Sequence, residues 1–289
     1  MGRSAIAIKK LTPAIGAEIS GIDLNAPMDT ATEDAIYRAL IDNLVIFFRD
    51  QDITPERHLT FARSFGTLDK PHPVYKQFPG HEGIIVLANN IGNPADTNEW
   101  HTDVTFQQEP PFASILVARE VPDCGGDTLW ASMYAAYDAL PDDMKSLIEP
   151  LSAVHDMGTF RNNFAVGETD AGKVLEAMPR FGMAIHRVVQ THPVTGRKFL
   201  FVNQAFTHSI VGMAGDESRR ILSYLYGRID RPEYQVRFHW TEGTVAMWDN
   251  RCTQHYAVND YLPANRCMNR VTVVNDRRTN QESRLSKVS

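Results

Sequence analysis

Two histidines and one aspartate have the residue types and spacing of a metal site. The stretch NEWHTDVTF, residues 98–106, places His101 two positions before Asp103 in a strand-like run. Because side chains alternate across a strand, both would point to one face, with Thr102 on the other. A third ligand, His255, is expected from the strand-like stretch WDNRCTQHYAVNDY. Two imidazoles and one carboxylate leave coordination positions open, an arrangement that suits iron(II) oxygenases.

A second signal comes from the segment NRCMNRVTVV, because an isolated His-x-Asp pair is more often a surface pair than a metal site. Strand alternation puts Arg266, Met268 and Arg270 of this segment on one side. If that side faces the interior, the two guanidiniums need anions, because an unpaired buried charge costs several kcal/mol. If it is a solvated edge, they need none.

The elements that must position these residues are mostly short strands. Strand-like runs separated by turn residues dominate from Ile84 to the NRVTVVN segment. Helices are expected at DTATEDAIYRALIDN, around 134–151 and 216–229, and at TPERHLTFARSFG, with Thr54 as N-cap. This pattern predicts a mainly β protein with peripheral helices, built as an antiparallel sandwich or barrel, for which a jelly roll is the commonest closure.

Length and composition favour one ordinary globular domain. The 289 residues contain 43% hydrophobic and 22% charged residues, without internal repeats, so we expect a single domain over 1–289. The strand pattern lapses at 157–182, which predicts a lid over the site. The polar segment from about 276 to 289 is expected to be a flexible tail.

Charge and hydropathy limit the expected partners. The net charge of -6 argues against nucleic acid or an anionic membrane, since both favour a basic face. No apolar run reaches the roughly 18 residues needed to span a bilayer, and the N-terminus lacks a signal-peptide layout, which predicts a cytoplasmic protein. Cys124, Cys252 and Cys267 have no metal or disulfide spacing and are expected to be buried free thiols.

The chain resembles the taurine dioxygenase family of iron(II)- and 2-oxoglutarate-dependent oxygenases over nearly its whole length. The shared motifs, in family order, are AIGAEISGIDL, VIFFRDQDITP, HPVY, WHTDVTF, GGDTLWAS, LFVNQAF, WDNRCTQHYAVNDYLP and NRVTV. The resemblance implies the double-stranded β-helix barrel, a homo-oligomer (dimer or tetramer), and Fe(2+), 2-oxoglutarate and O2 as cofactor and cosubstrates. It implies iron at His101, Asp103 and His255. Thr128 and Arg266 would hold the distal carboxylate of 2-oxoglutarate.

The resemblance also implies a pocket for a small anionic substrate. The expected substrate contacts are His72, Tyr75, Asn98, Val104, Phe106, Phe206 and Arg270. A gapless count puts Thr97, one step before Asn98, where close taurine enzymes have an asparagine. In the lid, Phe164 matches the family's aromatic residue if a short insertion is allowed.

The implied reaction is hydroxylation of the carbon next to the sulfonate of taurine or a similar alkyl sulfonate. It releases sulfite and an aldehyde, while 2-oxoglutarate becomes succinate and CO2. With Arg266 taken up by 2-oxoglutarate, Arg270 would need the anion of the substrate. The alternatives are an alkyl sulfatase or a carboxylate-substrate oxygenase of the same family, a zinc hydrolase, and a non-catalytic anion-binding barrel.

Overall fold

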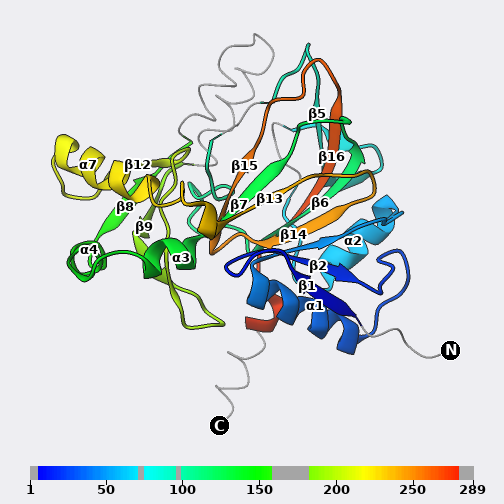
Figure 1. Cartoon of the computed structure of the whole chain (residues 1–289), viewed down its shortest axis with the longest axis horizontal. Helices are drawn as coiled ribbons and strands as arrows, with labels where there is room; N and C mark the ends of the chain where they lie inside the picture. The colour runs from blue at the N-terminus through cyan, green and yellow to red at the C-terminus, as the bar shows by residue number, and fades with distance from the viewer. Residues whose placement is uncertain (1–5, 71–74, 96–98, 158–181, 280–289) are drawn as a thin grey trace.

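A large sheet forms the centre of the computed structural model, which describes residues 6–70, 75–95, 99–157 and 182–279. Strand order does not follow the chain, because β14, β6 and β16 meet in the middle of this sheet (Figure 1). From edge to edge its strands are β1 (Ala7–Lys10), β2 (Ala17–Ser20), β3 (Val45–Phe48), β14 (Val245–Asp249), β6 (Ala113–Glu120), β16 (Arg266–Val273), β5 (His81–Asn89) and β4 (Gln77–Phe78).

A three-stranded antiparallel sheet packs against one face of the large sheet. Phe47 of β3 stacks on Phe238 with 3.8 Å between ring centroids, and meets the edge of Trp130 at 5.3 Å. These rings belong to a buried apolar cluster that joins the two sheets. Of the candidate site residues, Thr128 and His255 lie on the small sheet, and Arg266 and Arg270 lie on the large sheet. The small sheet has the order β13 (Gln235–Phe238), β7 (Thr128–Ser132) and β15 (Thr253–Ala257).

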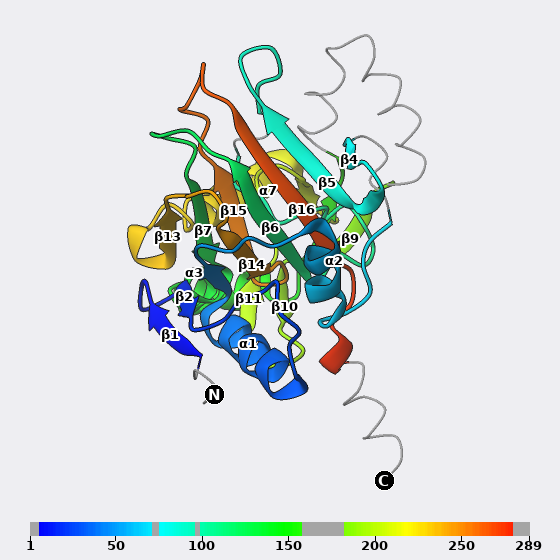
Figure 2. The same ribbon diagram turned by 90° about the vertical axis from the view of Figure 1, so that its right-hand side faces the viewer.

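Helices α1 (Thr30–Asn43) and α2 (Pro55–Arg63) cover the outside of the large sheet (Figures 1 and 2). Their apolar side chains form a second buried cluster with alternate residues of the sheet, including Val271 and Val273 of β16. Met268 lies instead in the cluster between the sheets. The alternation expected for β16 is therefore confirmed, with one side facing the helices and the other facing the small sheet.

The remaining elements form a lobe beside the two sheets, at the left of Figure 1. It contains a three-stranded sheet of order β12-β8-β9, a hairpin of β10 and β11, and short helices. The bounds are β8 (Ser152–His155), β9 (Ala184–Arg187), β10 (Val189–Thr191), β11 (Lys198–Leu200), β12 (Thr207–Ile210), α3 (Met133–Asp138), α4 (Asp142–Ile148), α7 (Gly215–Tyr226) and η1 (Pro232–Tyr234).

Most of the expected elements are present with small shifts. Thr54 caps α2 by accepting a hydrogen bond from the backbone N–H of Arg57, as the sequence predicts. The expected helical stretch at 134–151 is divided into α3 and α4 at Pro141, which precedes α4 as its N-cap. The expected strand HTDVTF is wrong: His101 makes a single bridge, and the residues after Thr102 form turns.

The predicted tail, the three cysteines and the predicted lid differ in how far the structure tests them. The start of the predicted tail is anchored, because Asp276 is buried and accepts hydrogen bonds from Tyr37 and Arg251. Its end, 280–289, lies outside the described residues. Of the three free thiols only Cys252 is buried, while Cys124 is exposed. The predicted lid at 157–182 lies, except for its two end residues, outside the described residues.

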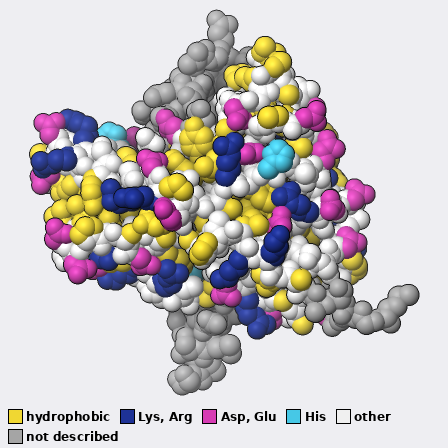
Figure 3. All heavy atoms as spheres, in the orientation of Figure 1, with side chains coloured by type: hydrophobic (Ala, Val, Ile, Leu, Met, Phe, Trp, Pro, Cys, Tyr) yellow, Lys and Arg dark blue, Asp and Glu magenta, His cyan; other side chains and the backbone are white. Residues whose placement is uncertain are grey.

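The surface mixes charges of both signs. On the face shown in Figure 3, Lys and Arg side chains are interspersed with Asp and Glu. In the described part of the chain, no helix is both long and apolar enough to cross a membrane.

We predict that the buried ion network at the end of β14 is worth more stability than a surface pair. Arg251 donates to Asp249 at 2.6 Å and to Asp276 at 3.0 Å, and both carboxylates are buried. Arg251→Met should lower the free energy of unfolding by about 3–5 kcal/mol in urea denaturation, because it leaves two buried charges uncompensated. The exposed Arg219 pairs with Asp216, so Arg219→Met should change the free energy of unfolding by about 0.5 kcal/mol or less. Equal losses would contradict this assignment.

Candidate metal centre

Three buried ligand atoms converge between the large sheet and the small sheet. One ligand atom each from His101, Asp103 and His255 lies within 4.8 Å of the others. Oδ1 of Asp103 is 3.9 Å from Nε2 of His101 and 3.7 Å from Nε2 of His255. The structure thus brings together the three residues that the sequence predicts as metal ligands.

Backbone pairing holds the two histidines side by side. The N–H of His101 donates to the carbonyl of His255 at 3.1 Å, and the reciprocal bond is 2.8 Å long. The hydroxyl of Thr102 donates to the carbonyl of Thr253. The segment before Asp103 is therefore fixed to the start of β15, although it is not part of a longer strand.

The segment from Asp103 onward is held by a side chain in place of a strand partner. The Asn250 amide accepts a hydrogen bond from the N–H of Asp103 and donates to the carbonyls of Asp103 and Pro111. Val104 has a φ of 47°, a left-handed conformation that is unusual for a β-branched residue. Strand alternation was thus the wrong reason for the convergence of His101 and Asp103, which results from a turn fixed by Asn250.

The nitrogens that face the centre are the Nε2 atoms of the two histidines. Nδ1 of His101 lies 2.8 Å from the carbonyl of Glu99, so Nδ1 donates a hydrogen bond to this carbonyl and Nε2 is the nitrogen left to face Asp103. Burial and the neighbouring His101 lower the pKa of His255 to about 3, so its ring is neutral at neutral pH. A neutral imidazole is the form that binds a metal ion.

The carboxylate of Asp103 remains ionised despite its burial. Burial raises the pKa of this group, but the charge of Arg270, the nearby His255 and other neighbours outweigh burial and hold the pKa below its usual range. Arg270 donates to Oδ1 at 3.1 Å, and Ser114 of β6 donates to Oδ2 at 2.8 Å. Two imidazoles and an ionised carboxylate are a donor set that fits a divalent metal such as iron(II).

Arg266 is a buried cation with neutral partners beside this centre. Its guanidinium donates to the carbonyl of Gly126 at 3.2 Å and lies 3.5 Å from the hydroxyl of Thr128, which also accepts from the indole of Trp240. Within the described ranges, no carboxylate oxygen lies within 4.0 Å of this guanidinium. Burial lowers the pKa of Arg266, but a guanidinium stays charged in proteins. The pair Arg266 and Thr128 therefore fits the carboxylate of a bound anion.

The predicted substrate residues fall into two groups. Phe106 and Phe206 meet edge to face at 5.2 Å, in a small buried cluster against which Tyr75 and Val104 pack. Arg270 lies over the ring of Tyr75 at 5.8 Å. The remaining predicted positions lie outside the described residues: His72, Thr97, Asn98 and Phe164.

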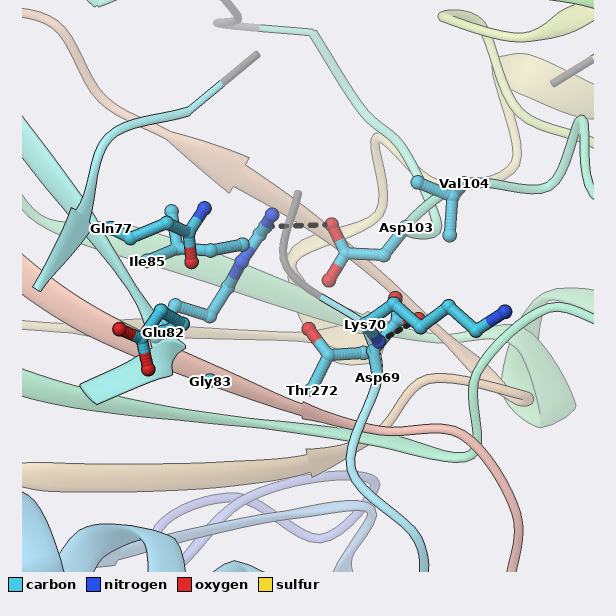
Figure 4. A pocket seen from close by; sticks show the side chains of 10 residues that line it. Asp69, Lys70, Gln77, Glu82, Gly83, Ile85, Asp103, Val104 and Thr272 are labelled. Carbon is cyan, nitrogen blue, oxygen red and sulfur yellow. Dashed lines mark hydrogen bonds and ion pairs between the residues drawn. The ribbon is translucent and has the colours of Figure 1, made fainter. Parts of the chain in front are cut away.

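A pocket beside Arg270 includes residues that the sequence did not single out. Figure 4 shows Asp103 and Val104 on one side of it and Asp69, Lys70 and Gln77 around it. The dashed line to Asp103 marks its bond to Arg270. Ser114 and Asn250 were also missed, although Asn250 lies within the quoted WDNRCTQHYAVNDYLP motif. Their roles depend on contacts with distant residues, which no local pattern records.

A second buried group, His192, Asp249 and Cys252, has the residue types of a metal site. The ring nitrogens of His192 and the carboxylate of Asp249 are, however, already engaged with protein partners. Nδ1 of His192 accepts from two backbone N–H groups, so its Nε2 carries the proton and donates to Asp249 at 3.0 Å. Asp249 is also paired with Arg251, and burial raises the pKa of the Cys252 thiol. This group is therefore a hydrogen-bonded network of the interior, and Asn250 directly follows Asp249 in the chain.

The fold and the buried triad define a jelly-roll protein with a candidate two-histidine, one-carboxylate metal centre. The family model described as "Taurine catabolism dioxygenase TauD, TfdA family" matches residues 7–272. The chain belongs to this family, and the family expected from the sequence is confirmed.

Individual relatives agree with this membership. The chain is 39% identical to an alkylsulfatase of Acinetobacter baylyi, over 93% of this chain and 85% of the relative. It is 36% identical to an alpha-ketoglutarate-dependent sulfate ester dioxygenase of Pseudomonas putida, over 95% of this chain and 91% of the relative. The crystal structure of a putative alpha-ketoglutarate-dependent taurine dioxygenase from Burkholderia xenovorans matches with a TM-score of 0.82 and 35% identity, over 94% of this chain and 93% of that one. The predicted jelly-roll fold is thereby confirmed.

We predict that Asn250 is needed to keep the ligand turn in place. Asn250→Ala removes the partners of one backbone N–H and two carbonyls. It should lower the free energy of unfolding by about 1–3 kcal/mol in urea denaturation, because buried polar groups lose their hydrogen bonds. Asn93 is exposed, so Asn93→Ala should change the free energy of unfolding by about 0.5 kcal/mol or less. An Asn250→Ala protein as stable as the parent would show that the turn holds itself.

Proposed function

We propose that the protein is an iron(II)- and 2-oxoglutarate-dependent dioxygenase that hydroxylates the carbon next to an oxidised sulfur group of a small anion. The observation that carries this proposal is the pairing of two buried features. The triad of His101, Asp103 and His255 offers three ligands to one metal. Arg266, beside it, is a buried cation with neutral partners only among the described residues. A zinc hydrolase would need the triad but not this cation.

Each cosubstrate has residues that would hold it. His101, Asp103 and His255 would bind the iron, and Arg266 with Thr128 would bind the distal carboxylate of 2-oxoglutarate. Iron(II), 2-oxoglutarate and O2 together would supply the oxidation that turns C–H into C–OH, with 2-oxoglutarate converted to succinate and CO2. The protein itself would contribute orientation, because charge-assisted hydrogen bonds from fixed side chains would orient 2-oxoglutarate and the substrate.

The substrate would lie between Arg270 and the aromatic cluster. Arg270 would attract its anionic head, and Phe106, Phe206, Val104 and Tyr75 would enclose the carbon chain. His72 and Asn98 stay predicted contacts. The sequence-based expectation that Arg270 lacks an anion and needs that of the substrate must be revised, because Arg270 already pairs with the carboxylate of Asp103. The anion of the substrate would therefore share Arg270 with the metal ligand.

Two substrate classes are candidates for this site. An alkyl sulfate ester is the first candidate, because the relatives at 39% and 36% identity are named for sulfate ester chemistry. A taurine-like alkyl sulfonate is the second, because a solved structure at 35% identity carries the name of a putative taurine dioxygenase. Hydroxylation next to either head gives an unstable product that collapses to an aldehyde. The sulfate ester then releases sulfate, and the sulfonate releases sulfite.

We predict that Arg266→Ala weakens 2-oxoglutarate binding to the Mn(II)-loaded protein by roughly 10–100-fold. A hydrogen bond to a charged group is worth about 1.5–3 kcal/mol, which corresponds to this range. Calorimetric titration with 2-oxoglutarate measures it. Arg119 is a matched control, because it is half-buried on β6 and also donates to a backbone carbonyl, that of Ile53. Arg119→Ala should bind like the parent, and a parent-like Arg266→Ala would remove Arg266 from the site.

A product assay tests the proposed reaction. The protein is incubated with iron(II), ascorbate, 2-oxoglutarate and either butyl sulfate or taurine, and succinate, sulfate and sulfite are measured. Sulfate with butyl sulfate supports the first candidate, and sulfite with taurine supports the second. Asp103→Ala should form none of these products and bind Mn(II) less tightly. Succinate without either sulfur anion would indicate a carboxylate substrate, and no succinate would leave a zinc hydrolase or an anion-binding barrel.

The cellular setting of this activity stays predicted from the sequence. A homo-oligomer, as a dimer or tetramer, is expected from the family resemblance. The cytoplasm is expected from the hydropathy of the sequence, and the net charge favours a small anion as the partner over nucleic acid or a membrane.

A further inference from the structure

A buried polar network lies directly behind the turn that carries Asp103, and neither the metal ligands nor the substrate residues account for it. Its centre is Thr105, which is 0% exposed. The hydroxyl of Thr105 lies 2.9 Å from Nδ1 of His155 and accepts a hydrogen bond from the amide of Asn203 at 3.0 Å. The carbonyl of Thr105 lies 2.8 Å from Nε2 of His186. The hydroxyl and the carbonyl of Thr105 are therefore both held from the neighbouring lobe.

Asn203 joins this turn to the aromatic wall of the candidate substrate pocket. While its amide nitrogen donates to Thr105, its amide oxygen accepts from the backbone N–H of Phe206 at 2.9 Å. The ring of Phe206 in turn meets Phe106 at 5.2 Å and His101 at 6.1 Å, both edge to face. One amide side chain thus sets the distance between the turn with Asp103 and the residue that faces His101.

The turn needs such support because no sheet fixes it. Residues 103–106 lie outside the strands, and Val104 adopts a φ of 47°. A β-branched residue in this conformation persists only where its surroundings hold it. Asn250 holds the beginning of the turn at Asp103, and Thr105 is the point at which its other end is held.

The network holds the turn through neutral hydrogen bonds. Burial and the nearby His186 lower the pKa of His155 to about 3, so its ring is uncharged at neutral pH. Nε2 of His155 has no hydrogen-bond partner among the described residues. Nδ1 of His155 lies closer to the hydroxyl of Thr105, at 2.9 Å, than to the hydroxyl of Thr207, at 3.4 Å.

We propose that Thr105 and Asn203 are positioning residues that fix the direction of the Asp103 carboxylate and link it to Phe206. The proposal rests on the proposed function, since it assumes that Asp103 binds the metal. Loss of the Thr105 hydroxyl would leave the amide of Asn203 and Nδ1 of His155 without this partner. The turn would then hold Asp103 less rigidly, and metal affinity would fall even where the fold is intact.

The test compares Thr105→Val, which has the same shape without the hydroxyl, with Thr105→Ser, which keeps the hydroxyl. Thr244→Val is the matched control, because Thr244 is also 0% exposed but bonds to Thr241 in the β13–β14 connection. Each protein is titrated with Mn(II) in a calorimeter, and its melting temperature is recorded. We expect Thr105→Val to bind Mn(II) roughly 10-fold more weakly, as for other residues that support metal ligands. Thr105→Ser and Thr244→Val should bind within about twofold of the parent.

The outcomes separate this proposal from the proposed function. A parent protein that does not bind Mn(II) overturns the metal centre itself. If the parent binds and Thr105→Val binds equally well, only the positioning role is overturned. It is also overturned if Thr244→Val is weakened as much, or if Thr105→Ser does not recover the affinity. Should Thr105→Val fail to fold, Asn203→Ala breaks the same bridge from the other side, and parent-like Mn(II) affinity there counts against the proposal.

Discussion

The structure depends on keeping one ionised carboxylate, that of Asp103, buried beside two imidazoles. Burial opposes its charge, and Arg270 and Ser114 offset that cost at Oδ1 and Oδ2. These partners come from β16 and β6 of the large sheet, whereas His255 comes from β15 of the small sheet. The ligand set therefore exists only where the two sheets are packed at the right spacing, and the apolar cluster around Phe47 and Trp130 provides that packing.

The two arginines on one side of β16 have different electrostatic surroundings. Arg270 is paired with a carboxylate, whereas Arg266 has a carbonyl and a hydroxyl as partners within the described residues. An anion is therefore required more strongly at Arg266 than at Arg270. Because Arg270 contacts Asp103 and also borders the candidate substrate pocket, it lies between this pocket and the candidate metal centre. A substrate anion there would change the surroundings of a metal ligand.

Side chains replace sheet hydrogen bonds where the ligands leave the strands. Asn250 holds Asp103, and its sequence neighbours Asp249, which is buried, and Arg251, which is partly buried, form an ion pair that Arg251 extends to Asp276. On the other side, Thr105 is held by the lobe that contains β8 and β12. The candidate metal centre is thus supported by polar groups from three parts of the fold.

The sequence by itself determined the residue types of the triad, the common side of Arg266 and Arg270, the cap at Thr54 and the mainly β class. These follow from local rules, since alternation has a period of two and a cap acts within three residues. Only the tertiary structure decided that HTDVTF is a turn, that Arg270 pairs with Asp103, and that Asn250 and Thr105 hold the ligand segment. Those bonds join residues 167, 147 and 98 positions apart. Contacts at such separations are set by how the sheets and the lobe pack, which no local pattern encodes.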